Sequence, residues 1–102
     1  MLLRVSFLFL FFFQLIFAQY SPSVNYTTAE GLPNNAIRSL FIDNENRLWI
    51  GTENGLSRLE NGVFFTLDIS NGLGHNSCWD ISQDDKGNMW FASYGGGVSK
   101  FN

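Results

Sequence analysis

The 102-residue sequence has a single cysteine, Cys78, and a single histidine, His75. One cysteine cannot form an internal disulfide, so a disulfide framework is excluded and the fold must be stabilised by packing. A lone histidine without companion ligands does not indicate a metal site, and we predict neither a metal nor a cofactor. We interpret Cys78 as a small core residue rather than a nucleophile.

Charged residues are also few. Six lysines and arginines stand against nine aspartates and glutamates, and the acidic excess is spread along the chain. Because no basic stripe is present, we expect no nucleic-acid partner. The acidic residues fall mainly in expected turns or are scattered along expected strands. No carboxylate pair or metal-ligand set therefore indicates an enzyme, and we predict no catalytic residue.

Long apolar runs are absent except at the N-terminus. After Arg4, a largely apolar run covers residues 5–17 and ends at Ala18, which is typical of a secretory signal peptide cleaved after Ala18. A membrane anchor is the alternative, but the run is shorter than the roughly 20 residues of a spanning helix and contains Gln14. We therefore expect an exported, periplasmic protein whose mature part has no membrane span.

The rest of the chain contains a repeat. Residues 31–52 align without a gap with residues 72–93, so that Trp49 meets Trp90, and one extra residue then enters the second copy. The period of about 41 to 42 residues is typical of β-propeller blades. The expected division is a signal peptide (1–18), a lead-in segment (19–30), a first blade (31–71) and a truncated second blade (72–102).

Strand and turn signals alternate within each copy. Runs rich in β-branched and aromatic residues are separated by Gly, Asn and Asp clusters, and Asn61-Gly62 predicts a two-residue hairpin. The expected strands cover 37–42, 47–52, 56–60 and 63–67 in the first copy, and 78–83, 88–93 and 97–101 in the second. Four short antiparallel strands per repeat predict an all-β fold of propeller blades, about 1.75 of them. Residues 23–30 have β-forming side chains, and we hypothesise that they supply the missing outer strand of the second blade.

Two aspartates recur at the start of a turn. We expect Asp43 and Asp84 to cap backbone N–H groups through an Asx-type bond. A calcium loop is the alternative, but it needs more oxygen ligands at fixed spacing. The turn role is therefore the prediction.

Tryptophan and glycine recur at fixed positions as well. Trp49 and Trp90 lie among apolar neighbours in the middle of strands, so we expect them to pack between adjacent blades. Gly55, Gly96 and Gly97 are expected to supply positive φ in the turn after that strand.

The joined motifs carry a family likeness. The segment GLPNNAIRSLFIDNENRLWIGTENGLSRLENGVFFTL closely resembles the two-component regulator propeller repeat, with its Gly-Leu-Pro-x-Asn opening, Asp-led turn and Leu-Trp-Ile-Gly-Thr strand. The second copy departs from this pattern at Gly74, at Ala92 and in the run Met89-Trp90-Phe91, and these changes are conservative in packing. The likeness covers residues 31–101.

The resemblance implies a sensory role. In such proteins, many blades form large periplasmic propellers ahead of a β-sandwich module, one membrane helix and a histidine kinase, and many members respond to breakdown products of polysaccharides. The family's kinase, receiver and DNA-binding residues have no counterpart here. We therefore expect a fragment of a sensor propeller that binds oligosaccharides in its full-length form, with further blades of the same parent chain as partners. An exported propeller enzyme acting on polysaccharide and an adhesion or scaffold propeller are the alternatives.

A ligand would be expected on one face of the blades. In a blade of four sequential strands, the connection between blades and the turn between the second and third strands emerge on the same side. The alternative is a set of solvated loops in which asparagine serves turn geometry. The residues expected on this face are Asn34, Asn35, Glu53, Asn54, His75, Asn76, Tyr94 and Gly95.

Fewer than two blades would also leave apolar surface open, because a repeat cannot bury its apolar face alone. We expect Trp49, Phe64, Phe65, Trp90 and Phe91 on open blade faces and a sticky chain. A fragment of a longer protein is the expectation, and a ring completed by other chains is the alternative.

Overall fold

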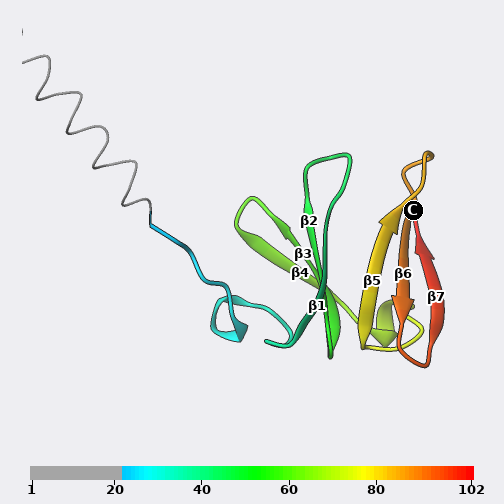
Figure 1. The fold of residues 1–102 in the computed structure, drawn as a ribbon, viewed down its shortest axis with the longest axis horizontal. Coiled ribbons are helices and arrows are strands. Elements are labelled where there is room, and N and C mark those ends of the chain that lie inside the picture. The colour runs from blue at the N-terminus through cyan, green and yellow to red at the C-terminus, as the bar shows by residue number, and fades with distance from the viewer. Residues whose placement is uncertain (1–21) are drawn as a thin grey trace, which may run out of the picture.

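The computed structural model describes residues 22–102, so the expected signal peptide and the start of the lead-in segment lie outside the described residues. The described part forms two antiparallel sheets whose strands follow chain order (Figure 1). The first sheet contains β1 (Ile37–Ile42), β2 (Leu48–Thr52), β3 (Gly55–Glu60) and β4 (Val63–Leu67); the second contains β5 (Cys78–Gln83), β6 (Met89–Ser93) and β7 (Gly97–Phe101). The predicted all-β fold of incomplete propeller blades is confirmed.

A short 3-10 turn precedes each sheet, η1 (Thr28–Glu30) before β1 and η2 (Ile69–Asn71) before β5. In η1, the Thr27 side chain accepts a hydrogen bond from the Ala29 N–H at 3.2 Å, and the Glu30 carboxylate accepts one from the Thr27 N–H at 2.7 Å. The same capping box recurs at the start of η2. The repeat therefore extends back into the lead-in segment.

The hypothesis that residues 23–30 add a strand to the second blade is wrong. The capping box closes residues 27–30 into a turn instead, and Gly31 ends it with a φ of 122°. The ring of Tyr26 packs edge-on against Phe64 of β4, with centroids 5.6 Å apart. Local side-chain hydrogen bonds thus compete successfully with the β propensity of this segment, and the aromatic contact holds it against the first sheet.

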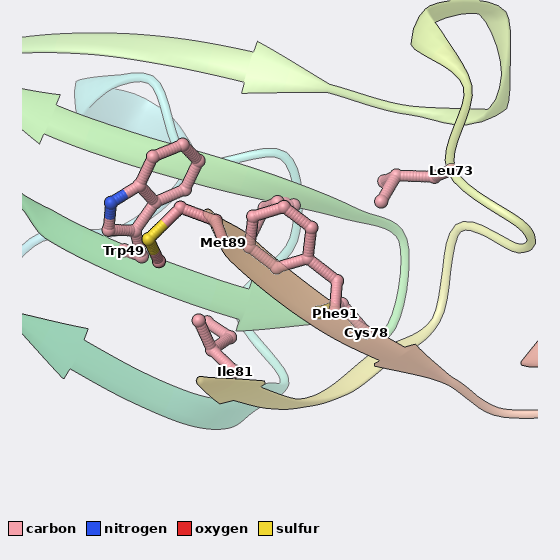
Figure 2. Close-up of a cluster of buried hydrophobic side chains, with 7 residues drawn as sticks. Trp49, Leu73, Cys78, Ile81, Met89 and Phe91 are labelled. Carbon is pink, nitrogen blue, oxygen red and sulfur yellow. The ribbon is translucent and has the colours of Figure 1, made fainter. Parts of the chain in front are cut away.

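The hydrophobic core lies between the two sheets (Figure 2). Trp49 of β2 meets Phe91 of β6 with ring centroids 5.3 Å apart and ring planes inclined by 44°. Both side chains are buried, because the two sheets turn these faces toward each other. The prediction that Trp49 packs between blades is therefore confirmed, whereas the expectation that Trp49 and Phe91 lie on open faces is wrong. The buried members of the core are Trp49, Leu56, Leu73, Cys78, Ile81, Met89 and Phe91.

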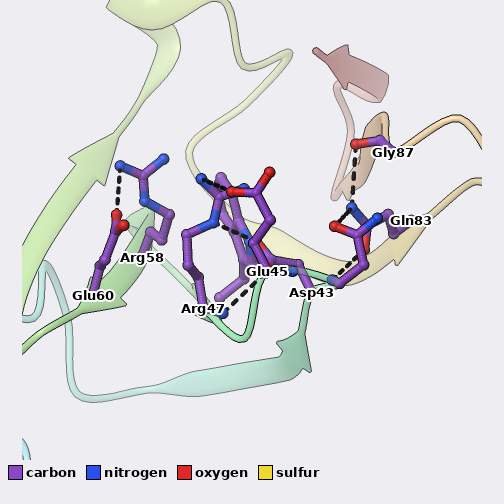
Figure 3. Close-up of polar contacts among 9 residues, drawn as sticks. Asp43, Glu45, Arg47, Arg58, Glu60, Gln83 and Gly87 are labelled. Carbon is purple, nitrogen blue, oxygen red and sulfur yellow. Dashed lines mark hydrogen bonds and ion pairs between the residues drawn. The ribbon is translucent and has the colours of Figure 1, made fainter.

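Hydrogen bonds join the sheets at both ends of this core. At one end, the side chain of Gln83 accepts from the Asn44 N–H at 2.8 Å and donates to the Asn44 side chain at 3.1 Å. The same Gln83 amide donates to the carbonyl of Gly87 at 3.2 Å (Figure 3). At the other end, the Gly55 N–H donates to the carbonyl of Asn76 at 2.6 Å. These contacts fix how the sheets lie against each other.

Glycine is required for two different reasons. Gly55, Gly95 and Gly97 have φ values of 120°, 76° and 74°, a region that favours residues without a Cβ. The expectation of positive φ at Gly96 is wrong, because the inserted residue shifts that role to Gly95. Gly96 instead approaches Gly74 so closely that an added Cβ would lie 2.5 Å from the carbonyl carbon of Gly74.

Some apolar side chains remain exposed, as expected. Phe65 and Trp90 are exposed, while Phe64 is half-buried beneath Tyr26. Among residues 22–102, no helix has the length and apolarity needed to cross a membrane.

Candidate functional site

Both copies of the repeat share an aspartate whose side chain accepts four hydrogen bonds. Oδ1 of Asp43 accepts the backbone N–H groups of Glu45 and Arg47, each at 2.9 Å. Its Oδ2 accepts a hydrogen bond from Nε of Arg47 at 2.8 Å (Figure 3). The same oxygen accepts one from Nε1 of Trp49 at 2.7 Å. Burial raises the pKa of the Asp43 carboxyl, but these hydrogen bonds outweigh burial and lower it to about 2.

Asp84 repeats this arrangement in the second copy. Its Oδ1 accepts from the backbone N–H groups of Lys86 and Asn88, and its Oδ2 accepts from the Asn88 amide at 3.0 Å and from Nε1 of Trp90 at 2.9 Å. The hydrogen bonds of Trp90 and Asn88 hold its pKa at about 2. Both carboxylates therefore face donors within their own turn, and both work as turn caps. Within residues 22–102, no three His, Cys, Asp or Glu side chains converge on a point that could hold a metal ion.

The loop side chains expected to meet a ligand form two matched sets of local hydrogen bonds. Oδ1 of Asn34 accepts the N–H of Ala36 at 2.7 Å, and Nδ1 of His75 accepts the N–H of Ser77 at 3.0 Å. These two side chains occupy equivalent positions of the repeat. Part of each therefore serves turn geometry, as the alternative interpretation anticipated.

The next residue of each copy connects the loop to the 3-10 turn. Oδ1 of Asn35 accepts the N–H of Thr28, and Oδ1 of Asn76 accepts the N–H of Ile69, both at 2.9 Å. The Asn76 amide also donates to Oδ1 of Asn54 at 3.4 Å. Amide groups from both sheets thus meet on this side of the molecule.

The tips of the hairpins lie beside these loops. The Glu53 N–H donates to the carbonyl of Ala36 at 3.1 Å, and the Tyr94 N–H donates to the carbonyl of Ser77 at 2.9 Å. The start of each first strand and the turn between the second and third strands are therefore neighbours. The expected loop residues are brought to one end of the two sheets.

Sequence reasoning placed Tyr94 at this end but missed Trp79, the aromatic residue that stacks on it. The rings of Trp79 and Tyr94 lie 5.0 Å apart at 21°, and both side chains are exposed. The guanidinium carbon of Arg38 lies 5.0 Å from the centroid of the Trp79 ring. We call Arg38, Trp79 and Tyr94 the aromatic patch.

β-bulges explain the position of this patch. The pairing of β1 with β2 shifts between Ile37 and Ser39, and that of β5 with β6 shifts between Cys78 and Asp80. A bulge leaves one residue unpaired and re-aims its side chain. Trp79 is the residue skipped in β5, and Arg38 is skipped at the equivalent place in β1. A position that is Arg in one copy and Trp in the other is not a core position. This difference between the copies already indicated, in the sequence, that Trp79 lies outside the core.

Neighbouring polar groups hold the patch. Nη2 of Arg38 forms an ion pair with Oε1 of Glu53, and Nε1 of Trp79 donates to Oγ of Ser77 at 2.7 Å. The Trp79 side chain is thus contacted by Arg38 of the first sheet and by Ser77 directly before the second sheet. The patch combines two ring faces and one guanidinium, and the Glu53 carboxylate is paired with that guanidinium.

Comparison with protein families decides the membership of the chain. The family model described as two component regulator propeller matches it twice, at residues 31–54 and at residues 72–95. The chain contains two copies of the two component regulator propeller repeat. The resemblance seen in the sequence is confirmed, and none of the curated proteins matches the chain.

Each of these two component regulator propeller repeats is matched from the glycine after a 3-10 turn to the tip of the hairpin between the second and third strands. All three residues of the aromatic patch lie inside the matched segments. Cys78, directly before Trp79, is fully buried, and burial raises the pKa of its thiol to about 11. Such a thiol is protonated at neutral pH and is a poor nucleophile.

Proposed function

We propose that the chain is a ligand-sensing propeller unit of a two-component regulatory system and that it senses oligosaccharides. The observation that carries the proposal is the exposed stack of Trp79 and Tyr94, with the guanidinium of Arg38 5.0 Å from the centroid of the Trp79 ring. Family membership supports the regulatory context. The proposal assigns the ligand to the aromatic patch rather than to the asparagine loops alone.

The chemistry of the patch fits a sugar. Aromatic ring faces offer apolar area with few rotatable bonds, which suits the flat C–H faces of a pyranose. The Arg38 guanidinium can donate hydrogen bonds to sugar hydroxyls, and the Glu53 carboxylate that pairs with it can accept them. Oδ1 of Asn34 and of Asn35 is occupied by backbone N–H groups, so these residues position the loops in the proposed site.

Export and protein partners belong to the same proposal. The apolar run at 5–17 and the family support a periplasmic location. Further blades of the same parent chain are the proposed protein partners, because a blade packs against two neighbours in a propeller. We propose no catalytic role, since Asp43 and Asp84 are occupied as turn caps and Glu53 is paired with Arg38.

Binding to defined sugars tests the ligand. Cellohexaose, xylohexaose, mannohexaose and maltohexaose are titrated into the full chain while tryptophan fluorescence is recorded. We expect a saturable change with at least one of them. Trp79→Ala and Tyr94→Ala should each weaken that binding by about tenfold or more, which corresponds to about 1.4 kcal/mol.

A matched control separates the patch from tryptophan in general. Trp90 is also exposed but belongs to the far face of the second sheet, so Trp90→Phe should leave the affinity unchanged. Equal weakening by Trp90→Phe, or unchanged binding in Trp79→Ala, would remove the patch from the proposal. No saturable change with any of the four sugars would remove these oligosaccharides as ligands.

A further inference from the structure

Three hydrogen bonds of Ser77 connect one loop to both rings of the aromatic patch. The Ser77 N–H donates to Nδ1 of His75 at 3.0 Å, and Oγ of Ser77 accepts from Nε1 of Trp79 at 2.7 Å. The carbonyl of Ser77 accepts from the N–H of Tyr94 at 2.9 Å. Because Ser77 is only 9% exposed, its polar groups depend on these partners more than on water. The placement of both rings is therefore linked to the bond between Ser77 and His75.

The first copy builds the same loop around an acceptor that does not titrate. At the equivalent positions, the Ala36 N–H donates to Oδ1 of Asn34 at 2.7 Å, and the carbonyl of Ala36 accepts from the N–H of Glu53 at 3.1 Å. The acceptor in the loop is thus an amide oxygen in one copy and the imidazole of His75 in the other. An imidazole nitrogen accepts only when it carries no proton, whereas an amide oxygen always accepts. The two copies of this loop therefore differ in their response to acid.

We propose that His75 makes the aromatic patch sensitive to pH: Trp79 and Tyr94 are held in place while the imidazole is neutral and are released when it is protonated. The inference concerns the regulation of the site proposed above, and its effect on sugar binding rests on that proposed function. The hydrogen bonds that carry it do not involve a ligand, so the change in the patch is measurable without one.

Protonation reverses the role of Nδ1 of His75. In the imidazolium both ring nitrogens are donors, so Nδ1 and the Ser77 N–H would face each other as two donors. His75 is exposed, and its ring can turn toward water. Ser77 is almost buried, and leaving its N–H without a partner is costly. The loop must then move until that N–H reaches water, and the hydroxyl and the carbonyl of Ser77 move with it.

Movement of Ser77 acts on both rings of the patch. Trp79 loses the acceptor that holds its indole, and Tyr94 loses the carbonyl that anchors its backbone. The two stacked rings, 5.0 Å apart, are then less ordered before a ligand arrives. Ordering them on binding costs free energy, so a ligand should bind more weakly at acidic pH. The net loss of one hydrogen bond corresponds to about a two- to tenfold loss of affinity.

Other ionisable groups lie on the elements packed against this loop. The β2–β3 hairpin contacts the loop through the Gly55 N–H, the β6–β7 hairpin through Oγ of Ser93, β7 through Oγ of Ser99 and η2 through the Ile69 N–H. The ionisable groups on these elements and beside the patch are Glu53 with its partner Arg38, Asp68, Asp80, Tyr94 and Lys100. Carboxylic acids ordinarily change charge near about pH 4, and tyrosine and lysine near about pH 10. Histidine is the side chain that does so between about pH 5 and 8, and His75 is the only histidine of the chain.

Nuclear magnetic resonance of the full chain tests the proposal without a ligand. The chain has three tryptophans, so its ¹H–¹⁵N spectrum contains three indole signals, and the signal missing in Trp79→Phe belongs to Trp79. Between about pH 8 and 5, we expect the Trp79 indole and the Tyr94 amide to shift with one common midpoint. The other two indoles are internal controls and should not shift, because they donate to carboxylates whose pKa of about 2 keeps them charged over this range.

His75→Asn is the matched variant, because the amide of Asn34 makes the same bond in the first copy. The Trp79 and Tyr94 signals of His75→Asn should not shift over this pH range.

Binding is measured with cellohexaose, xylohexaose, mannohexaose and maltohexaose at about pH 7.5 and about pH 5.5. For a sugar that binds, we expect the Kd to rise about two- to tenfold at the lower pH. In His75→Asn the two Kd values should be equal. Absence of binding at both pH values would refute these sugars as ligands, and the spectra would still decide whether His75 controls the patch.

Three results would overturn the inference. One is a Trp79 indole signal that stays constant over the pH range. Another is an equally large shift of that signal in His75→Asn, since the shift then comes from a different ionisable group. The last is a bound sugar whose Kd is the same at both pH values, because the patch then binds equally well whether or not His75 is protonated.

Discussion

Trp49 donates its indole N–H to Oδ2 of Asp43 at 2.7 Å, and both side chains are buried at the junction of the two sheets. The residue that caps the turn and the residue that fills the core are thus one hydrogen-bonded unit. Asp84 and Trp90 form the same unit at 2.9 Å on an open face. The repeat therefore carries its packing residue in a fixed orientation before a neighbouring blade covers it.

Replacing Asp43 by asparagine should destabilise the fold. Two donors, Nε of Arg47 and Nε1 of Trp49, point at Oδ2 of Asp43, and an amide nitrogen there would face them without accepting. Leaving buried donors unsatisfied costs about 1–3 kcal/mol each. We expect Asp43→Asn to lower the free energy of unfolding by about 2–4 kcal/mol, measured by urea denaturation with tryptophan fluorescence.

Asp84→Asn is the matched control. Trp90 is exposed, and the Asn88 amide can rotate to present its oxygen to the new amide nitrogen. Water can also satisfy Nε1 of Trp90. We expect a loss of less than about 1 kcal/mol. Equal losses in the two variants would contradict the assignment of the larger effect to buried donors.

Acid should weaken the fold through the same carboxylates. The folded state holds the pKa of Asp43 at about 2, below the ordinary value of 3.8, so the charged form is favoured in the folded state. The resulting stability, about 2 kcal/mol for Asp43, is fully present above pH 3.8 and is lost as the pH falls toward about 2. Urea midpoints measured across this range should fall, and they should fall less in Asp43→Asn. A midpoint with the same pH dependence in both proteins would refute the linkage to Asp43.

Gly51→Ala should disturb the contact between the sheets. The new methyl group would press on Oγ of Ser39 and on the carbonyl oxygen of Cys78, and a backbone oxygen of a packed strand cannot move freely. Overpacking of this kind costs about 1–3 kcal/mol. The comparison is Ala92→Gly, at the equivalent position on the open face, which should change unfolding by less than about 1 kcal/mol. A stable Gly51→Ala protein would show that the sheets can separate at no cost.

Some features could be predicted from the sequence because they depend on local chemistry that recurs in both copies. The strand positions followed from the alternation of β-branched and aromatic residues with turn residues, and the caps of Asp43 and Asp84 followed from their place before a turn. Twofold repetition made both signals stronger. The interior place of Trp49 also followed from the repeat, since a mid-strand tryptophan needs a neighbouring sheet to bury it.

Other features depend on register and on packing between distant segments. Trp79 was overlooked because its outward direction depends on the bulge between Cys78 and Asp80 in β5, and the residue pattern does not reveal that bulge. The prediction for Gly96 was wrong because the inserted residue changed which glycines of the turn adopt a positive φ. The strand proposed at 23–30 failed because the side chain of Glu30 returns to the N–H of Thr27, a reciprocal bond that β propensity does not reveal.

The thiol of Cys78 should report the separation of the two sheets. Cys78 has no exposed surface, and burial raises the pKa of its thiol from 9.0 to about 11. At pH 8, the thiolate fraction of a group with this pKa is about 100-fold below that of an ordinary cysteine. We expect labelling by a disulfide reagent to be at least about 100-fold slower in the folded protein than in urea. Gly51→Ala should accelerate labelling, because the added methyl group presses on the Cys78 backbone. Asp84→Asn should not, because Asp84 lies outside the buried core. Labelling of the folded protein at the rate seen in urea would place Cys78 outside the core and contradict the closed junction between the sheets.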